Sequence, residues 1–408
     1  MRNLLLLASA LAFSQTGVVV YLSFAALTGY WLADDKSMAT LPLALQFVGN
    51  ALVVIPVSIL MRKHGRRTGF IIGQSLGAAG ATLSVVSVLQ HDFWLFCWAA
   101  ILIGAHNAVW QHYRFAALEC VRSSRQSMAV GLVLSGGVVA AFLGGPLADW
   151  GELSLSVLYA GGYAVVVGLC LLSLFILCFL HIEAIPESIT ALELESRTEP
   201  SSLKRPAYKV RPLRQIVSTE KFVLAVTVSS FSFAMMAFVM NATPLAMKLC
   251  GFEVEASNRV VQLHTLGMFA PSVFTAILIR WQGHFRTMIA GIACFASALV
   301  INLSGIEFVH FAVALLLVGL GWNLMFISST DLLVQTYRES EKEKVQATHD
   351  LFMFGVVGGT NYFAGASLMK LGWEGVNLLA LVPLTGLLLL LLWRVGKPAT
   401  VVEQLPAR

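Results

Sequence analysis

The chain has 408 residues, of which 57% are hydrophobic and 12% charged, and its mean hydropathy is +0.78. This composition excludes a water-soluble globular protein, in which roughly a quarter of the residues carry a charge. The formal net charge of +5 does not indicate a nucleic-acid partner, because in so apolar a chain the positions of the basic residues matter more than their sum.

Twelve apolar segments follow one another along the chain and predict an all-α integral membrane protein. Each lasts about 20 residues, long enough to cross ~30 Å of hydrocarbon as a helix and too long for the alternating strands of a barrel. The first begins like a signal peptide but continues to Leu32, so we expect it to remain as a helix. The segments cover residues 3–32, 38–61, 68–90, 93–118, 127–148, 155–181, 221–247, 259–280, 287–304, 307–335, 345–370 and 373–394.

The segments divide into two sets of six, which predicts two related bundles. The basic turns after the second and eighth segments match, since Arg62 to Arg280 and Gly65 to Gly283 are both shifts of 218 residues. A duplicated unit of this kind places a ligand site between its halves near the bilayer midplane. The expected division is a bundle over 1–182, a cytoplasmic linker over 183–220, a bundle over 221–396 and a cytoplasmic tail over 397–408. The basic part of the linker either rests on anionic lipid headgroups or is a solvated tether.

The distribution of basic residues predicts that both termini are cytoplasmic, because short loops that are rich in lysine and arginine stay inside. With this orientation only Lys36, Lys248, Arg259 and Lys370 fall outside, and Arg114 lies within a segment.

The sequence lacks the common motifs for catalysis and for cofactor binding. The sequence contains no phosphate-binding P-loop, no H-E-x-x-H, and no cysteines at metal-ligand spacing, so we expect no cofactor, no metal and no catalysis.

Polar residues inside the apolar segments are the candidates for a solute cavity, because each is costly in lipid. In the fourth segment Asn107, Gln111 and Arg114 fall on one helical face at 100° per residue. The alternative is that Arg114 only extends to the interface. Aromatic rings beside these groups either stack on a planar solute or fill the core. The other predicted cavity residues are Gln15, Asn241, Trp322 and Asn323.

Charged and titratable residues near the predicted cytoplasmic side are candidates for a gate or for proton coupling. Arg114 and Asp331 occupy corresponding positions in the two halves and either face each other as a gate or pair within their own halves. His349 and Asp350 are neighbours that point about 100° apart on a helix, so we expect no direct relay between them. The candidates for coupling protons are Glu119, His264, Asp331 and Asp350.

The arrangement resembles the major facilitator superfamily. The turn after the second segment keeps the Gly-Arg-Arg of that family's loop signature as Gly65, Arg66 and Arg67, but Arg62 replaces its aspartate. Gly145-Pro146 partly matches the family's antiporter signature, although Asp149 and Trp150 stand where two glycines are expected. The stretches from Gln111 to Ala117 and from Gly319 to Asn323 are similar to a bacterial permease subgroup, one branch of which is associated with riboflavin uptake.

The resemblance implies a fold and a function. The first, fourth, seventh and tenth helices would line a central cavity, and the protein would act as a monomer. The expected function is secondary active transport of a small organic solute, such as riboflavin, across the inner membrane by alternating access, driven by protons. A drug or metabolite efflux antiporter of the same fold is the alternative, and a membrane-embedded enzyme or sensor is the more remote one.

Overall fold

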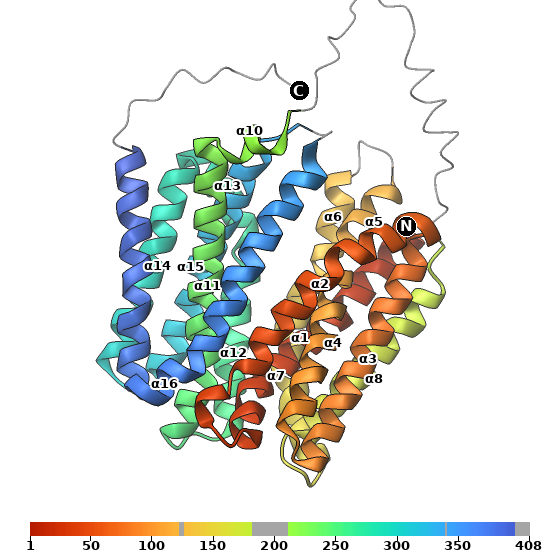
Figure 1. Ribbon diagram of the computed structural model, residues 1–408, viewed down its shortest axis with the longest axis vertical. Helices are drawn as coiled ribbons and strands as arrows, with labels where there is room; N and C mark the ends of the chain where they lie inside the picture. The colour runs from red at the N-terminus through yellow and green to blue at the C-terminus, as the bar shows by residue number, and fades with distance from the viewer. Residues whose placement is uncertain (122–125, 182–210, 339–340, 396–408) are drawn as a thin grey trace, which may run out of the picture.

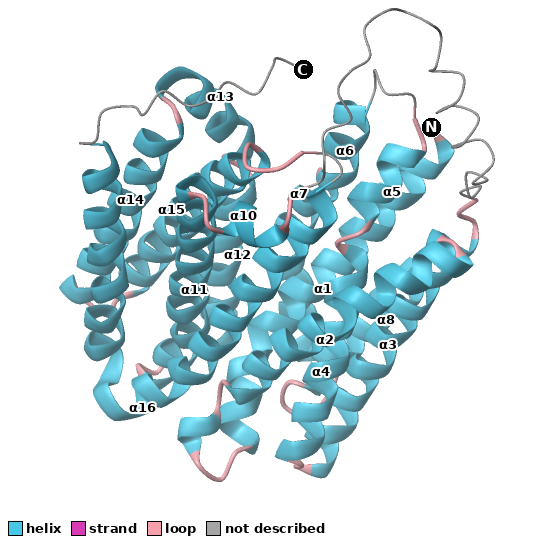
Figure 2. Ribbon diagram, turned by 45° about the horizontal axis from the view of Figure 1, so that its top comes forward, coloured by secondary structure: helices cyan, strands magenta, loops and turns pink. Residues whose placement is uncertain are grey.

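The computed structural model describes residues 1–121, 126–181, 211–338 and 341–395. Figure 2 shows that the regular elements within these ranges are all helices. The first bundle contains α1 (Arg2–Leu32), α2 (Leu41–His64), α3 (Arg66–Gln90), α4 (Phe93–Trp110), α5 (Tyr113–Glu119), α6 (Gln126–Leu134), α7 (Gly136–Ser154) and α8 (Ala160–Cys178), with the short η1 (Lys36–Met38). The second contains α10 (Leu213–Val217), α11 (Glu220–Leu249), α12 (Val254–Phe269), α13 (Ser272–Gln282), α14 (His284–Ser304), α15 (Phe308–Val334) and α16 (Lys342–Val395).

The helices agree with the twelve predicted segments. In the described ranges ten helices are long and apolar enough to cross a membrane, or eleven when α12 and α13, which bend by 44° beside Pro271, count as one span. α16 has 54 residues and would be about 80 Å long if straight, more than twice the hydrocarbon thickness. Its backbone breaks at Gly372, where φ is +69°, between the last two predicted segments.

The fourth predicted segment is one span with a tightened turn. α4 ends at Trp110, and α5 begins at Tyr113. The His112 ring places Nδ1 2.9 Å from the carbonyl oxygen of Ala108 and must donate to it, so this ring competes with a backbone hydrogen bond of the helix. The polar face predicted through Asn107, Gln111 and Arg114 thus crosses this turn, with Asn107 on α4 and Arg114 on α5.

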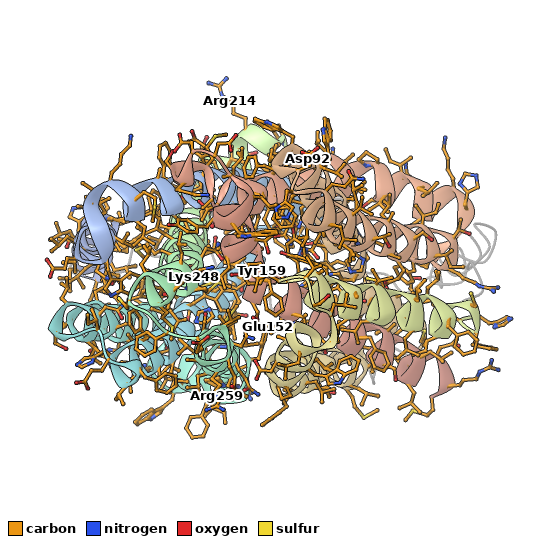
Figure 3. All side chains as sticks on the ribbon, turned by 90° about the horizontal axis from the view of Figure 1, so that it is seen from below. Asp92, Glu152, Tyr159, Arg214, Lys248 and Arg259 are labelled. Atoms are coloured by element: carbon orange, nitrogen blue, oxygen red, sulfur yellow. The ribbon has the colours of Figure 1, made fainter. Side chains whose placement is uncertain are left out.

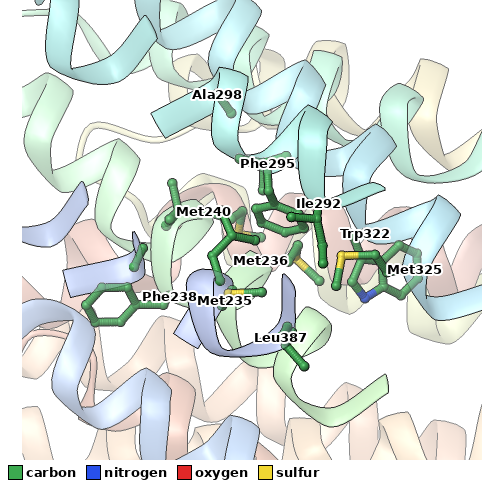
Figure 4. Packing of buried hydrophobic residues seen from close by; sticks show 14 of the residues in the cluster. Met235, Met236, Phe238, Met240, Ile292, Phe295, Ala298, Trp322, Met325 and Leu387 are labelled. Carbon is green, nitrogen blue, oxygen red and sulfur yellow. The ribbon is translucent and has the colours of Figure 1, made fainter. Parts of the chain in front are cut away.

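Each bundle has its own buried core. α1 packs against α7 and α8 in the first bundle, and α15 packs against α11, α12 and α14 in the second. Figure 4 shows the methionine-rich core of the second bundle, with Trp322 beside Met325 at its edge. Close packing of this kind is what holds helices together in lipid.

The two bundles meet at the end of the molecule opposite the termini. In Figure 1, the N-terminal end of α1 lies away from α11 and α16, and its other end lies beside the second bundle. Side-chain hydrogen bonds between the bundles, within the described ranges, all lie toward this end. They join Asn258 Nδ2 to Asp149 Oδ1 (2.7 Å), Lys248 Nζ to Tyr159 OH (2.8 Å), Gln262 Nε2 to Phe142 O (3.1 Å), and Thr40 to Tyr362 O and Gly365 N. Figure 3, seen from this end, shows Lys248 next to Tyr159.

An ion pair holds α10 against the beginning of α16 at the termini end. Arg211 Nη2 lies 2.7 Å from Oε2 of Glu341, whose side chain is only 1% exposed. Glu341 also accepts hydrogen bonds from the backbone N–H groups of Arg211 and Arg338. The Arg211 guanidinium and these donors lower the pKa of Glu341 from 4.5 to about 2. Arg211, in the basic part of the predicted linker, thus binds a carboxylate of the protein.

Glu341→Gln is expected to lower the free energy of unfolding by about 2 kcal/mol, because a buried charge-assisted pair is lost. The pKa of Glu341 is lower in the folded than in the unfolded chain, so its stabilisation is full above about pH 4.5 and is lost as the pH falls toward 2. Thermal unfolding in detergent between pH 3 and 7 measures both effects. Glu220→Gln, which removes a half-exposed pair with Arg394, is the control and should change little.

Tyr159→Phe is expected to weaken the contact between the bundles, at the end where they meet, by about 1 kcal/mol. The substitution removes the hydrogen bond to Lys248 and keeps the ring. Hydrogen–deuterium exchange should then be faster in residues 148–154 and 254–260. Tyr163→Phe is a matched control, because its hydroxyl donates a 2.8 Å bond to Thr28 inside the first bundle. Equal acceleration in both variants would contradict a specific role in closure.

Candidate functional site

The turn between α2 and α3 is built around Gly65, whose φ of +85° ends one helix and starts the next. Arg62 lies in the last turn of α2. Arg66 Nη2 pairs with Glu119 Oε1 of α5 at 2.6 Å, and Arg67 donates to the carbonyl oxygen of Cys178. The turn therefore ties α3 to α5 and α8 within the first bundle.

The second bundle repeats this construction. Gly283 has a φ of +84°, and His284 after it places Nε2 2.6 Å from Asp331 Oδ2 of α15. Arg66–Glu119 and His284–Asp331 are thus equivalent contacts in the two bundles. Asp331 pairs within its own bundle in this structure, and the Arg114 guanidinium lies over the Phe115 ring at 4.9 Å.

Several predicted cavity residues bond within their own bundle. Asn107 Oδ1 accepts from Trp110 Nε1 at 3.2 Å, and the Asn241 amide donates to Asn361 Oδ1 at 2.7 Å. The Gln15 amide lies against Gly137 of α7. Gln111 caps the end of α4. The amides of Asn107 and Gln111 remain half-buried, so α4 can offer polar groups to a solute.

Two predicted residues bond to backbone carbonyl oxygens within the second bundle. Asn323 is 1% exposed and bonds to the carbonyl oxygen of Met268 (2.6 Å), to Ser272 Oγ (2.9 Å) and to Thr275 Oγ1 (2.5 Å). The Nδ1 atom of His264 lies 2.9 Å from the carbonyl oxygen of Leu315. In this structure the Asn323 amide joins α15 to the α12–α13 bend, leaving little of its hydrogen-bonding capacity for a solute.

Trp322 belongs to an aromatic cluster that spans the two bundles. Its ring stacks on Phe326 at 4.7 Å and 13°, and Phe233 of α11 lies 5.7 Å away. Phe233 contacts Phe47 of α2, which in turn contacts Phe354 of α16. We call Phe47, Phe233, Trp322, Phe326 and Phe354 the aromatic cluster. It offers several flat apolar faces where the bundles meet.

Unpartnered polar atoms accompany this cluster. Trp322 is 8% exposed, and its Nε1 has no hydrogen-bond partner among the described residues. Asn50 Oδ1, one helical turn after Phe47, and Ser230 Oγ, one turn before Phe233, also lack partners there. Buried donors and acceptors are nearly always satisfied, so each unpartnered atom needs an explanation, and the Trp322 N–H is the one that belongs to the aromatic cluster itself.

Phe47 and Asn50 were missed by the sequence reasoning. An asparagine within an apolar segment is a recognisable signal because it is costly in lipid. The second segment was considered only for the basic turn at its end. Which helix faces another segment is set by helix packing, and hydropathy along one chain does not contain that information.

His349 and Asp350, which we expected to point about 100° apart, are in contact. His349 Nδ1 lies 2.8 Å from Asp350 Oδ1. His349 Nε2 lies 2.8 Å from Ser229 Oγ of α11. These three residues form a hydrogen-bonded chain that joins α11 to α16.

A hollow of about 370 Å³ at the α12–α13 bend does not suit a polar solute. Its lining is apolar except for Thr275, which bonds to Asn323, and its Phe274 is 77% exposed on the outer surface. This hollow therefore faces the lipid.

Comparison with known proteins identifies the fold. The family model described as Major Facilitator Superfamily matches residues 4–360. The chain is 32% identical to the riboflavin transporter RfnT of Brucella anthropi over 95% of its length and 94% of that protein. It is 25% identical to the MFS-type transporter YdeG of Bacillus subtilis, over 96% of this chain and 90% of the relative, and 24% identical to YddS of the same organism, over 88% and 83%. The chain is a multi-pass membrane protein that belongs to the Major Facilitator Superfamily of solute transporters.

Proposed function

We propose that this protein imports riboflavin or a closely related flavin. The main support is the aromatic cluster with its orphan Trp322 N–H, located between the bundles. The similarity to a riboflavin transporter over 95% of the chain points to the same solute.

The chemistry of a flavin matches this cluster. Its tricyclic ring is flat and largely apolar, so it stacks on aromatic side chains with a gain of about 1 kcal/mol per ring beyond burial. The ring carries carbonyl oxygens and nitrogens that accept hydrogen bonds, which suits the indole N–H of Trp322. The polyhydroxyl chain requires donors and acceptors of the kind that Asn107, Gln111 and Asn241 provide.

The proposed location is the inner membrane, with both termini in the cytoplasm, where the positive-inside rule puts them. In this orientation the end where the bundles meet faces outward, and the end that carries the termini faces the cytoplasm. Protons are the proposed driving ion, and the monomer is the proposed functional unit. The two bundles, with the division proposed from the sequence, move against each other to expose the site alternately to the two sides.

Import is favoured over efflux by a feature of α7. Asp149 stands where the antiporter signature of the family has glycine, and it accepts a hydrogen bond from Asn258 across the bundles. A carboxylate at this position supports a dedicated closure contact.

Uptake by a riboflavin-auxotrophic bacterial host distinguishes import from efflux, since an importer raises the flavin content of the cell and an exporter lowers it.

Trp322→Phe is expected to weaken flavin binding roughly fivefold, because it removes the N–H and keeps a ring. Trp322→Leu should weaken binding more, since stacking is also lost. Quenching of riboflavin fluorescence by the purified protein gives the affinities, and uptake at low flavin concentration gives the effect on transport. Trp373→Phe is the matched control, because this indole is also 8% exposed with an unpartnered N–H but packs on Phe311, outside the cluster. Equal losses in Trp322→Phe and Trp373→Phe would overturn the assignment.

A further inference from the structure

The hollow at the α12–α13 bend exists because the two parts of this span meet α15 differently. Before the bend the backbones touch, since a Cβ added to Gly319 of α15 would collide with the carbonyl oxygen of His264. Past the 44° bend beside Pro271, a space of about 370 Å³ lies between α13 and α15. Its sides come from Phe274 and Leu278 on α13 and from Leu320 and Leu324 on α15.

Asn323 bonds to both sides of the bend and leaves the hollow apolar. Its amide donates to the carbonyl oxygen of Met268 on one side and to Ser272 Oγ on the other. Thr275, the residue with a polar side chain in the lining, donates its hydroxyl to Asn323 Oδ1. An apolar space whose polar group is already bonded suits a hydrocarbon chain and does not suit water, which needs polar partners.

The hollow continues along α13 toward the end of the molecule where α13 lies in Figure 1, the termini end. Leu278 and Trp281 follow Phe274 by four and seven residues, so the three side chains share one helical face. Phe274 is 77% exposed and Trp281 is 83% exposed. From Pro271 to Arg280 the helix rises ~13 Å, close to half of the ~30 Å hydrocarbon thickness. A chain that enters beside Trp281 therefore reaches the hollow within one leaflet.

Two exposed arginines stand at this entrance. Arg280 lies in the last turn of α13, and Arg286 lies in the first turn of α14. Neither guanidinium has an ion pair or a hydrogen bond among the residues that the structure describes, and residues 260–306 contain no aspartate or glutamate. Asp331 of α15 reaches this turn but is bound by His284. The entrance is therefore positively charged.

The first bundle has the same charge but one continuous helix at the equivalent place. The shift of 218 residues puts Arg280 on Arg62 and α13 on the end of α2, which runs as one helix from Leu41 to His64. Arg62 is also exposed. The positive-inside rule accounts for basic residues in both turns, so charge alone does not distinguish them. The second turn differs because a bend and an apolar hollow lie next to it.

We propose that this place binds one anionic phospholipid, with an acyl chain in the hollow and its phosphate group between Arg280 and Arg286. The phosphate accepts charge-assisted hydrogen bonds from the two guanidinium groups. The chain gives the side chains that line the hollow the packing contacts that an empty space lacks. The occupant is a lipid and not the transported solute, because the hollow opens to the membrane.

Native mass spectrometry of the purified full-length protein measures this binding, with phosphatidylglycerol and phosphatidylcholine of the same acyl chains as probes. We expect one phosphatidylglycerol to bind more tightly than phosphatidylcholine. Arg280→Gln combined with Arg286→Gln is expected to weaken phosphatidylglycerol binding roughly 25-fold, about fivefold for each arginine. Arg62→Gln combined with Lys63→Gln is the matched control and should leave this binding unchanged. Equal affinities of the parent protein for the two lipids, or equal losses in the two double variants, would overturn the headgroup assignment.

A second pair of variants tests the hollow and keeps both arginines. Leu278→Trp fills the space and is expected to weaken phosphatidylglycerol binding about tenfold, because about two methylene groups of the chain lose their burial. Ile277→Trp is the control, since it adds the same ring to a 57% exposed position outside the lining. Thermal unfolding in detergent checks that both variants fold.

Glycerol phosphate, which has the phosphate but no acyl chain, is expected to leave the melting temperature of the parent protein unchanged, whereas phosphatidylglycerol raises it. Equal binding of the lipid by Leu278→Trp and Ile277→Trp, or equal stabilisation by glycerol phosphate and by the lipid, would show that the hollow is not the binding site. Neither experiment measures flavin, so failure of this inference leaves the proposed function untouched.

Discussion

The hydrocarbon interior is the constraint on which this structure depends, because it offers no water to a polar group. The chain satisfies most of its intramembrane polar side chains inside one bundle. Gln74 bonds to Tyr113 in the first bundle, and Asn302 bonds to Asn377 in the second. Few polar groups are left to join the bundles, and those that do so lie toward one end. A protein of this kind can part its bundles at the other end without breaking many hydrogen bonds, which is what alternating access requires.

The same constraint explains why the unpartnered groups are informative. A buried donor without a partner costs about 1–3 kcal/mol, and a ligand that bonds to it recovers this cost. Trp322, Asn50 and Ser230 come from three helices of both bundles, and each belongs to the aromatic cluster or lies one helical turn from a residue of it. A solute that stacks on the rings and bonds to these groups recovers the cost and draws the bundles together around itself. Binding and closure are then coupled by the same contacts.

The sequence predicted the helices well and their partners poorly, for a physical reason. The length of each apolar run shows where a helix crosses the membrane, so the twelve segments followed from hydropathy. The equivalent turns at Gly65 and Gly283 followed from the shift of 218 residues between the two halves. Contacts between helices depend on their relative rotation and tilt, which one sequence does not encode in a readable form. The expected separation of His349 from Asp350 assumed side chains that point straight out from an ideal helix. The hydrogen bond between these two side chains shows that neighbouring residues can still meet.

Arg62 replaces the family's loop aspartate, and other residues supply an ion pair near this loop. An ion pair near that loop is present, but it is made by Arg66 with Glu119, and its counterpart in the second bundle is made by His284 with Asp331. Both pairs brace helices within a bundle, so neither changes when the bundles rock. A contact that senses the rocking must join groups from different bundles. In the described ranges the side-chain contacts of this kind lie at the end opposite the termini, among them Asn258 with Asp149 and Lys248 with Tyr159, so the end that they close is where bundle movement has to break polar contacts.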